Sequence, residues 1–260
     1  MVTDYLEGKA GADRFYRGSY RSPGDFRAKA EELNERFDSG RRESLARLIA
    51  PVGVEAAAKL EAVLSSNGFV VTTGQQPGLF GGPLYSLYKA LTAVRLAETL
   101  EHELGKPVMP LFWVASDDHD WAESNHTSLI DGNNELRELT LGPRPTAADA
   151  TLSRTPLGSG VNEALEALQG ALPDSEFSAP WLEKVRSAYR PEATVAAAFR
   201  ELMSALLAGT PVGMVDAADP VLKTAGAPVM EREILTALEG EEILAKRTGE
   251  LEAEGYVGQV

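Results

Sequence analysis

Residues 69–74 read FVVTTG, and this short apolar stretch sets the interpretation of the whole chain. It is rich in β-branched residues and ends at a glycine, which is typical of a buried strand. A second apolar run, LFWVA at residues 111–115, predicts another buried strand with Phe112 and Trp113 in the core. Pro110 fits the first position of that strand, because proline cannot donate a hydrogen bond to an interior sheet ladder.

The segment between the two strands is predicted to be a helix. Pro83 suits the first helical position, and Gly105 and Pro107 stop the helix before the second strand. The apolar face of this helix consists of Leu84, Leu87, Tyr88, Leu91 and Val94. A strand, a helix and a strand in succession predict a βαβ unit, in which the two strands lie parallel.

The remaining chain extends this α/β unit. Residues 193–207 predict an amphipathic helix, and residues 212–215 predict a third parallel strand. Three strands leave exposed sheet edges, so we expect the chain to be a fragment of a longer protein. We divide it into an N-terminal helical segment packed on the core (1–64), the first half of the core (65–130), an inserted connecting segment with only two short hints of helix (131–190) and a truncated continuation of the core (191–260).

Composition argues against several classes of function. The 260 residues carry a formal net charge of −14, so the chain repels polyanions and nucleic acid is not an expected partner. The absence of cysteine excludes thiol catalysis by the protein itself. There is no apolar run long enough for a membrane span and no secretory signal, so we expect a cytoplasmic protein that acts on small molecules.

The functional site is expected beyond the carboxyl ends of the strands, where open α/β sheets bind their ligands. All three predicted strands end in polar clusters, which begin at Thr73, Ser116 and Asp216. Because parallel strands end at one edge of a sheet, the clusters should converge, and the first two should face each other across one crevice. Asp216 is a candidate binding residue by its position alone. The alternative is a plain turn, because aspartate before proline often occurs in turns.

The first cluster is a glycine-rich loop that reads TGQQPGLFGGPLY at residues 73–85. Glycines let a ligand approach the backbone, and the start of the following helix favours a phosphate or a carboxylate. The spacing matches neither common nucleotide-binding fingerprint, and a plain connecting turn is the alternative. The candidate binding residues are Thr73, Gly74, Gln75, Gln76, Gly81, Gly82, Tyr85 and Lys89, of which Lys89 could equally be a solvated surface residue.

The second cluster follows the second strand directly. Its candidate catalytic residues are Asp117, Asp118, His119 and Asp120, and Asn125 and His126 are candidate binding residues. Adjacent carboxylates repel one another, which raises the pKa of at least one of them and suits proton transfer. The acids could equally hold a substrate amine or Mg²⁺, or cap the following helix. Neither thiolates nor a known histidine motif accompany them, so zinc is not expected.

Two of these segments resemble the bacillithiol-synthesis family of cysteine-adding enzymes (BshC). The resemblance is carried by residues 73–85 with 88–90 and by residues 107–120 with 125–126, while residues 4–6, 255–256 and 259–260 are similar to the flanks of the family. The match is collinear over nearly all of the chain, and the two central motifs are long and specific.

The resemblance implies a Rossmann-like core with inserted segments, as in class I aminoacyl-tRNA synthetases, and a C-terminal coiled coil that this chain lacks. It implies a homodimeric ligase that joins the carboxyl group of cysteine to the amine of glucosaminyl-malate. ATP would be the energy source, with Mg²⁺ as an optional second cofactor. One departure concerns the place where class I synthetases carry a His-Ile-Gly-His motif, because residues 82–85 read GPLY here, without histidine.

Two other functions stay open at this point. A metal-dependent hydrolase could use Asp117, Asp118, His119 and Asp120 together with Asp216. A non-catalytic nucleotide-binding subunit would instead tolerate loss of Asp118 and His119. Metal analysis tests the first of these alternatives, and alanine variants of the two residues test the second.

Overall fold

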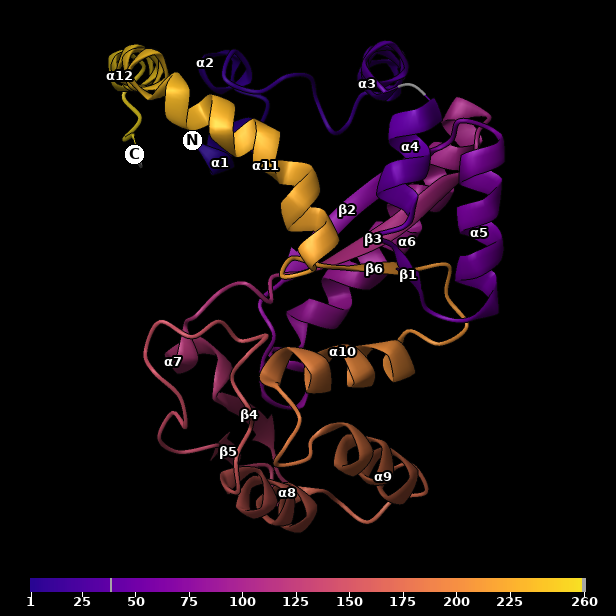
Figure 1. Ribbon diagram of the computed structural model, residues 1–260, viewed down its shortest axis with the longest axis vertical. Coiled ribbons are helices and arrows are strands. Elements are labelled where there is room, and N and C mark those ends of the chain that lie inside the picture. The colour runs from indigo at the N-terminus through magenta and orange to yellow at the C-terminus, as the bar shows by residue number, and fades with distance from the viewer. Residues whose placement is uncertain (38, 259–260) are drawn as a thin grey trace. The chain divides into compact units, whose positions relative to one another are not determined.

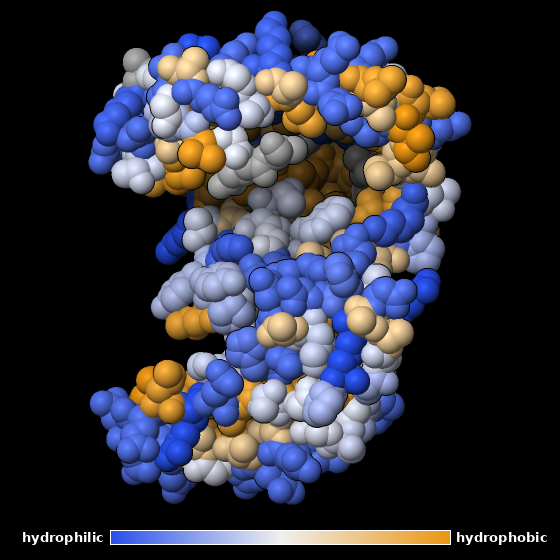
Figure 2. All heavy atoms as spheres, turned by 90° about the vertical axis from the view of Figure 1, so that its left-hand side faces the viewer, coloured by the Kyte–Doolittle hydropathy of each residue, from blue (hydrophilic) through white to orange (hydrophobic). Residues whose placement is uncertain are grey.

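The computed structural model describes residues 1–37 and 39–258, which form two compact units (Figure 1). Phe37–Asp219 make the larger unit, and Met1–Arg36 combine with Pro220–Val260 in the smaller one, each as far as it is described. Gln259 and Val260, at the C-terminal end of the family resemblance, lie outside the described residues. Hydrophilic residues cover most of the face shown in Figure 2, in keeping with the charge of −14.

The smaller unit is helical and joins the two ends of the chain. Its helices are α1 (Val2–Leu6), α2 (Ala10–Asp13), α3 (Pro23–Arg36), α11 (Pro220–Leu235) and α12 (Ala237–Ala253). Arg14 Nη1 lies 2.6 Å from Glu254 Oε1, and the Tyr256 hydroxyl donates to Asp4 Oδ2 at 3.1 Å. Polar contacts therefore tie residues that are about as far apart in the sequence as the chain allows.

The larger unit is built around a four-stranded sheet in the order β1-β6-β3-β2. Strands β2 (Phe69–Gln75), β3 (Val108–Val114) and β6 (Gly213–Asp216) run parallel, which confirms the predicted parallel sheet. The short strand β1 (Ala50–Pro51), which the sequence did not indicate, pairs antiparallel with β6. Helix α6 (Tyr85–Leu104) connects β2 to β3 and completes the predicted βαβ unit.

The prediction for the start of the second strand was wrong, because Pro110 is the third residue of β3. In a strand with a parallel neighbour on each side, successive residues form hydrogen bonds to the two neighbours in turn. The Ala115 N–H donates to Gln75 O of β2, so the odd-numbered residues face β2 and residue 110 faces β6. Pairing between β3 and β6 begins only at Leu111. The missing proline N–H therefore falls where no ladder partner exists.

Side chains of β3 alternate between two environments. Phe112 is fully buried, with its ring centroid 6.2 Å from that of Phe199 on α10 (Val195–Leu206). The prediction that Trp113 is also a core residue was wrong, since Trp113 is 37% exposed. Neighbouring residues of a strand point to opposite faces, and α6 and α10 pack on the face of Phe112.

The residues before and after this sheet form additional helices and a hairpin. Helices α4 (Ser39–Ala46) and α5 (Val54–Ser65) precede β2, and α5 contacts β3. After β3 come α7 (Trp121–Ser124), the antiparallel strands β4 (His126–Ile130) and β5 (Leu136–Thr140), and helices α8 (Gly160–Ala171) and α9 (Ser178–Ala188). Among the described residues, no helix combines the length and apolar character needed to cross a membrane.

Residues 131–190 are more regular than the sequence indicated. The two hints of helix lie within α8 and α9, and the hairpin was not foreseen. Val161, Leu165 and Leu168 of α8 are buried in a second apolar cluster that also contains Leu79. Burial on one face stabilises α8 more than its local sequence does, because glycine and asparagine near its start have low helix propensity.

Candidate active site

The carboxyl ends of the three parallel strands lie level at one edge of the sheet. Gln75 of β2 pairs with Val114 of β3, and Val114 pairs with Asp216 of β6. Two loops leave this edge, and we call residues 75–84 the Gln–Gly loop and residues 115–120 the Asp–His loop. The predicted convergence of the strand ends is confirmed by this register.

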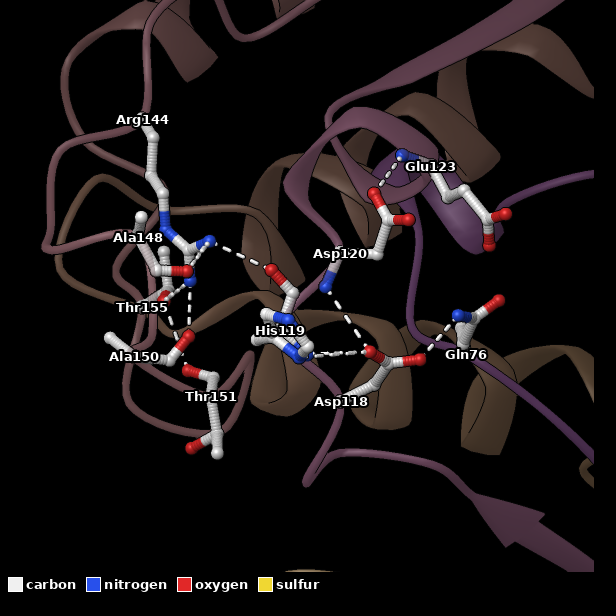
Figure 3. Close-up of polar contacts among 10 residues, drawn as sticks. All are labelled: Gln76, Asp118, His119, Asp120, Glu123, Arg144, Ala148, Ala150, Thr151 and Thr155. Atoms are coloured by element: carbon white, nitrogen blue, oxygen red, sulfur yellow. Dashed lines mark hydrogen bonds and ion pairs between the residues drawn. The ribbon is translucent and has the colours of Figure 1, made fainter.

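The two loops are in direct contact through their side chains. Gln76 Nε2 donates a hydrogen bond to Asp118 Oδ2, and Asp118 Oδ1 accepts from the backbone N–H groups of His119 (2.6 Å) and Asp120 (3.2 Å) (Figure 3). The Gln–Gly and Asp–His loops therefore lie next to each other as expected, but the cavity beside them is lined by the first loop and not by the Asp–His loop, so the expected crevice between the two loops is not what the structure shows.

The Asp118 carboxyl has the opposite electrostatic character to the one expected for adjacent acids. The hydrogen bond from Gln76 is the largest influence and lowers its pKa, the two backbone N–H groups act in the same direction, and partial burial opposes them. Donors that bind the ionised form outweigh the cost of partial burial. Asp118 is therefore an ionised acceptor at neutral pH and not a source of protons.

The other members of the acidic cluster have different surroundings. His119 is 68% exposed, and its Nδ1 lies 3.7 Å from Asp118 Oδ1, beyond hydrogen-bond distance. Asp120 is the N-cap of α7, where its Oδ1 accepts from the Glu123 N–H at 3.0 Å. The capping alternative is thus observed for Asp120, while the side chain of Asp117 is exposed.

Tyr189 holds the Gln–Gly loop from inside the protein. It is fully buried at the C-terminal end of α9, donates its hydroxyl proton to Gly78 O at 2.8 Å and accepts from the Gly81 N–H at 2.9 Å. Burial raises the pKa of Tyr189, so the hydroxyl stays protonated. Gly82 has φ +67°, and a Cβ on Gly78 would lie 2.9 Å from Gly82 Cα, so this turn requires glycine.

Lys89 of α6 is exposed and contacts the end of β2 and the start of the Gln–Gly loop. Its Nζ donates to Gln75 Oε1 at 2.9 Å and to Gly74 O at 3.3 Å, and lies 5.1 Å from the centroid of the Tyr85 ring. Gln75 Nε2 in turn donates to the Tyr85 hydroxyl at 3.2 Å. The structure thus brings together four of the predicted binding residues: Gly74, Gln75, Tyr85 and Lys89. The Gln75 amide is already hydrogen-bonded through its nitrogen to Tyr85 and through its oxygen to Lys89.

Arg144 supports the Asp–His loop from a neighbouring segment. Its guanidinium donates to the carbonyl oxygens of His119 (2.7 Å), Ala148 (2.9 Å) and Ala150, and to Thr155 Oγ1 at 3.3 Å (Figure 3). The Leu152 N–H adds a bond to Asp118 O at 2.7 Å. A planar guanidinium can bind several carbonyl groups at once, and here it fixes the shape of the polypeptide around the loop.

Asp216 is engaged in a contact between β3 and β6. Its Oδ1 accepts from the fully buried Ser116 hydroxyl and from the Ala218 N–H at 3.0 Å, and its Oδ2 lies 2.7 Å from Arg200 Nη1. These partners occupy both carboxylate oxygens. The geometry therefore gives Asp216 a role in holding the strand ends together, and its predicted role in ligand binding stays a prediction.

A cavity of about 440 Å³ opens between the Gln–Gly loop and the segment formed by α7 and β4. Four of the predicted site residues line it, namely Gln75, Gln76, Tyr85 and His126. The aspartates of the Asp–His loop do not line this cavity, and Asp118 is connected to it through Gln76. Glu123, Thr127 and Ser128 complete the polar part of the lining.

Comparison with known proteins agrees with this arrangement. A family model described as "Bacillithiol biosynthesis BshC, N-terminal Rossmann-like domain" matches residues 1–260. This chain belongs to the BshC family. A relative from Prosthecochloris aestuarii, named "Putative cysteine ligase BshC", is 32% identical over all of this chain and 47% of its own length. Another of the same name, from Chlorobium phaeobacteroides, is 32% identical over 95% of this chain and 45% of its own length.

The chain thus spans about half the length of the curated BshC relatives it matches. The description of the family model confirms the expected Rossmann-like core, and the likeness to class I aminoacyl-tRNA synthetases stays a prediction. Within residues 1–37 and 39–258, no three histidine, aspartate or glutamate side chains gather as a metal site would require. The geometry therefore gives the metal-dependent hydrolase no support.

Sequence reasoning missed three residues that shape this BshC site. Tyr189, Arg144 and Arg200 lie outside the quoted motifs and act through the backbone or through another side chain. No local pattern distinguishes them, because their partners in the two loops and at the end of β6 (Gly78, His119 and Asp216) lie 16 to 111 residues away in the sequence. Ser116, the partner of Asp216, is different, because it begins the second polar cluster and could be recognised from the sequence as a neighbour of the acids.

Proposed function

We propose that this chain contributes the substrate site of a ligase that joins the carboxyl group of cysteine to the amine of glucosaminyl-malate. The observation that carries the proposal is the hydrogen bond between Gln76 and Asp118, which brings the two long family motifs together beside a cavity of about 440 Å³. The name that the BshC relatives carry, cysteine ligase, supports this activity.

The proposed reaction requires a group that accepts a proton and a group that holds the binding residues in place. The amine nitrogen forms a bond to the carboxyl carbon of cysteine, one carboxyl oxygen leaves, and the amine loses a proton. We propose that the imidazole of His119 accepts the proton that the amine loses. This imidazole is exposed on the Asp–His loop and is not hydrogen-bonded to Asp118. Asp118 stays ionised and holds Gln76 in place, and so acts as a positioning residue.

A free carboxylate must be activated before an amine can displace its oxygen, and we propose ATP as the source of that activation. The residues around the cavity do not fit a triphosphate. Glu123 contributes a negative charge to the lining, and Lys89, the nearby cation, is bound to Gln75 and Gly74. Phosphate groups require donors and positive charge, so we derive no step through ATP in this cavity.

The test is a reaction of the full-length protein with cysteine, glucosaminyl-malate, ATP and Mg²⁺, analysed for bacillithiol by mass spectrometry. We expect product that disappears when any one substrate is omitted and that falls sharply in His119→Ala. Glu166→Gln, a change to an exposed carboxylate on α8, is the matched control and should keep full activity. Folded wild-type protein that forms no bacillithiol would overturn the proposal.

A further inference from the structure

The cavity between the Gln–Gly loop and α7 presents hydrogen-bond acceptors that lack partners. The first is the carboxylate of Glu123, an exposed side chain that lines the cavity. Its backbone N–H is taken up by the Asp120 cap, but within the described part of the chain its carboxylate makes neither a hydrogen bond nor an ion pair. Glu123 is thus available to a ligand.

The second acceptor is the amide oxygen of Gln76. The partner of its Nε2 is a carboxylate oxygen of Asp118, which is ionised and can only accept, so the orientation of the amide is fixed. Figure 3 shows the Gln76 nitrogen toward Asp118 and the oxygen turned away from it. In the described residues this oxygen has no hydrogen-bond partner, and Gln76 lines the cavity.

The third acceptor is a ring nitrogen of His126. The Nδ1 atom lies 3.2 Å from Asn125 Oδ1, which can only accept, so Nδ1 carries the proton of that hydrogen bond. In the neutral imidazole the Nε2 atom is then an acceptor. His126 lines the same cavity as Glu123 and Gln76. The amide of Gln75, in contrast, already uses its nitrogen on Tyr85 and its oxygen on Lys89.

Three acceptors, one of them negatively charged, match a group that has several donors and a positive charge. We infer that this cavity binds a primary ammonium group, with Glu123 as its counter-charge, and that the group is the α-ammonium of cysteine. The inference rests on the proposed function for the identity of the amino acid. Gln76 then contacts the substrate on one side and Asp118 on the other.

Two amines take part in the proposed reaction, and the electrostatics of the cavity distinguish them. A nearby carboxylate favours the charged form of an amine and so keeps it protonated. A protonated amine has no lone pair and cannot attack a carboxyl carbon. The cavity therefore suits the amine that stays unreacted, which is that of cysteine, and not the attacking amine of glucosaminyl-malate.

The test compares full-length wild-type protein with Glu123→Gln, which keeps the shape of the side chain and removes its charge. In steady-state kinetics the KM for cysteine should rise about 10- to 100-fold, the range for loss of a charged hydrogen bond. The KM for glucosaminyl-malate should not change, and kcat should stay within about threefold, because the interaction is made equally in the ground and transition states. Glu166→Gln is the control, and Glu123→Asp should give an intermediate KM.

A binding measurement without turnover separates this inference from the proposed function. Calorimetric titration of L-cysteine should show about tenfold or more weaker binding to Glu123→Gln, whereas 3-mercaptopropionate, which lacks the amine, should bind both proteins equally. That pattern without any bacillithiol formation would keep the ammonium site and overturn the ligase. Equal loss for both ligands, or no loss for cysteine in a folded variant, would overturn the ammonium site even if bacillithiol forms.

Discussion

The Gln–Gly loop and the Asp–His loop leave the same edge of the sheet but are held in place by different means. The first has buried residues at its centre and is fixed by the hydroxyl of the fully buried Tyr189. The second exposes Asp117 and His119 and is fixed by the partly buried Arg144 and by backbone bonds. The first loop is thus an extension of the core, while the second is a surface loop supported by polar groups.

The difference matters for the site because the side chains of the two loops meet at Gln76 and Asp118, beyond the backbone bond from the Ala115 N–H to Gln75 O. A loop that belongs to the core is expected to open only when the core opens, whereas a surface loop can open locally at lower cost. Changes to the supports of the first loop should therefore lower the stability of the whole unit. Changes to those of the second should mainly loosen the loop itself.

The largest effect is expected for Tyr189→Phe. The ring can still pack against Phe80, whose centroid is 5.1 Å away, but Gly78 O and the Gly81 N–H lose their buried partner. We expect the free energy of unfolding to fall by about 2 kcal/mol, measured by urea denaturation. The control is Tyr88→Phe on the exposed side of α6, and equal stability of the two variants would contradict a core-like Gln–Gly loop.

A smaller and more local effect is expected for Arg144→Ala. This change removes the hydrogen bonds to the carbonyl oxygens of His119, Ala148 and Ala150, and should lower stability by about 1.5 kcal/mol. Hydrogen exchange should become faster in residues 115–120 and stay unchanged in residues 75–84. Arg144→Lys should not restore protection, because an ammonium cannot reproduce the planar fork of the guanidinium. Faster exchange in both loops would show that they open together.

The smallest effect is expected for Asp118→Asn, and it should depend on pH. The pKa of Asp118 is lowered below 3.8 in the folded protein, so its carboxylate stabilises the fold above that pH and the contribution is lost as the pH falls through the folded-state pKa. We expect the variant to be less stable by about 0.5–1 kcal/mol at neutral pH. Urea denaturation should show this difference shrinking below pH 3.8, and a constant difference would contradict the assigned pKa direction.

Much of the sheet and of the meeting of the two loops could be predicted from the sequence. The stretch around Phe69 is short, apolar and β-branched, the run around Phe112 is short and apolar, and the helix between them has clear ends, so the βαβ unit follows from local chemistry. The position of ligand-binding loops at the carboxyl ends of parallel strands follows from topology alone. The hairpin of β4 and β5 escaped prediction, because its strands are mostly exposed and lack a regular apolar alternation.

The sequence by itself therefore determined the βαβ unit, the parallel direction of its strands and which two motifs meet at the strand ends. Only the tertiary structure decided that Tyr189 supports the Gln–Gly loop, that Asp120 caps a helix, and that Glu123 and the oxygen of Gln76 are left without partners beside a cavity. Periodicity and turn chemistry are properties of neighbouring residues. Hydrogen-bond partners and burial depend on contacts between distant segments, which exist only after the chain has folded.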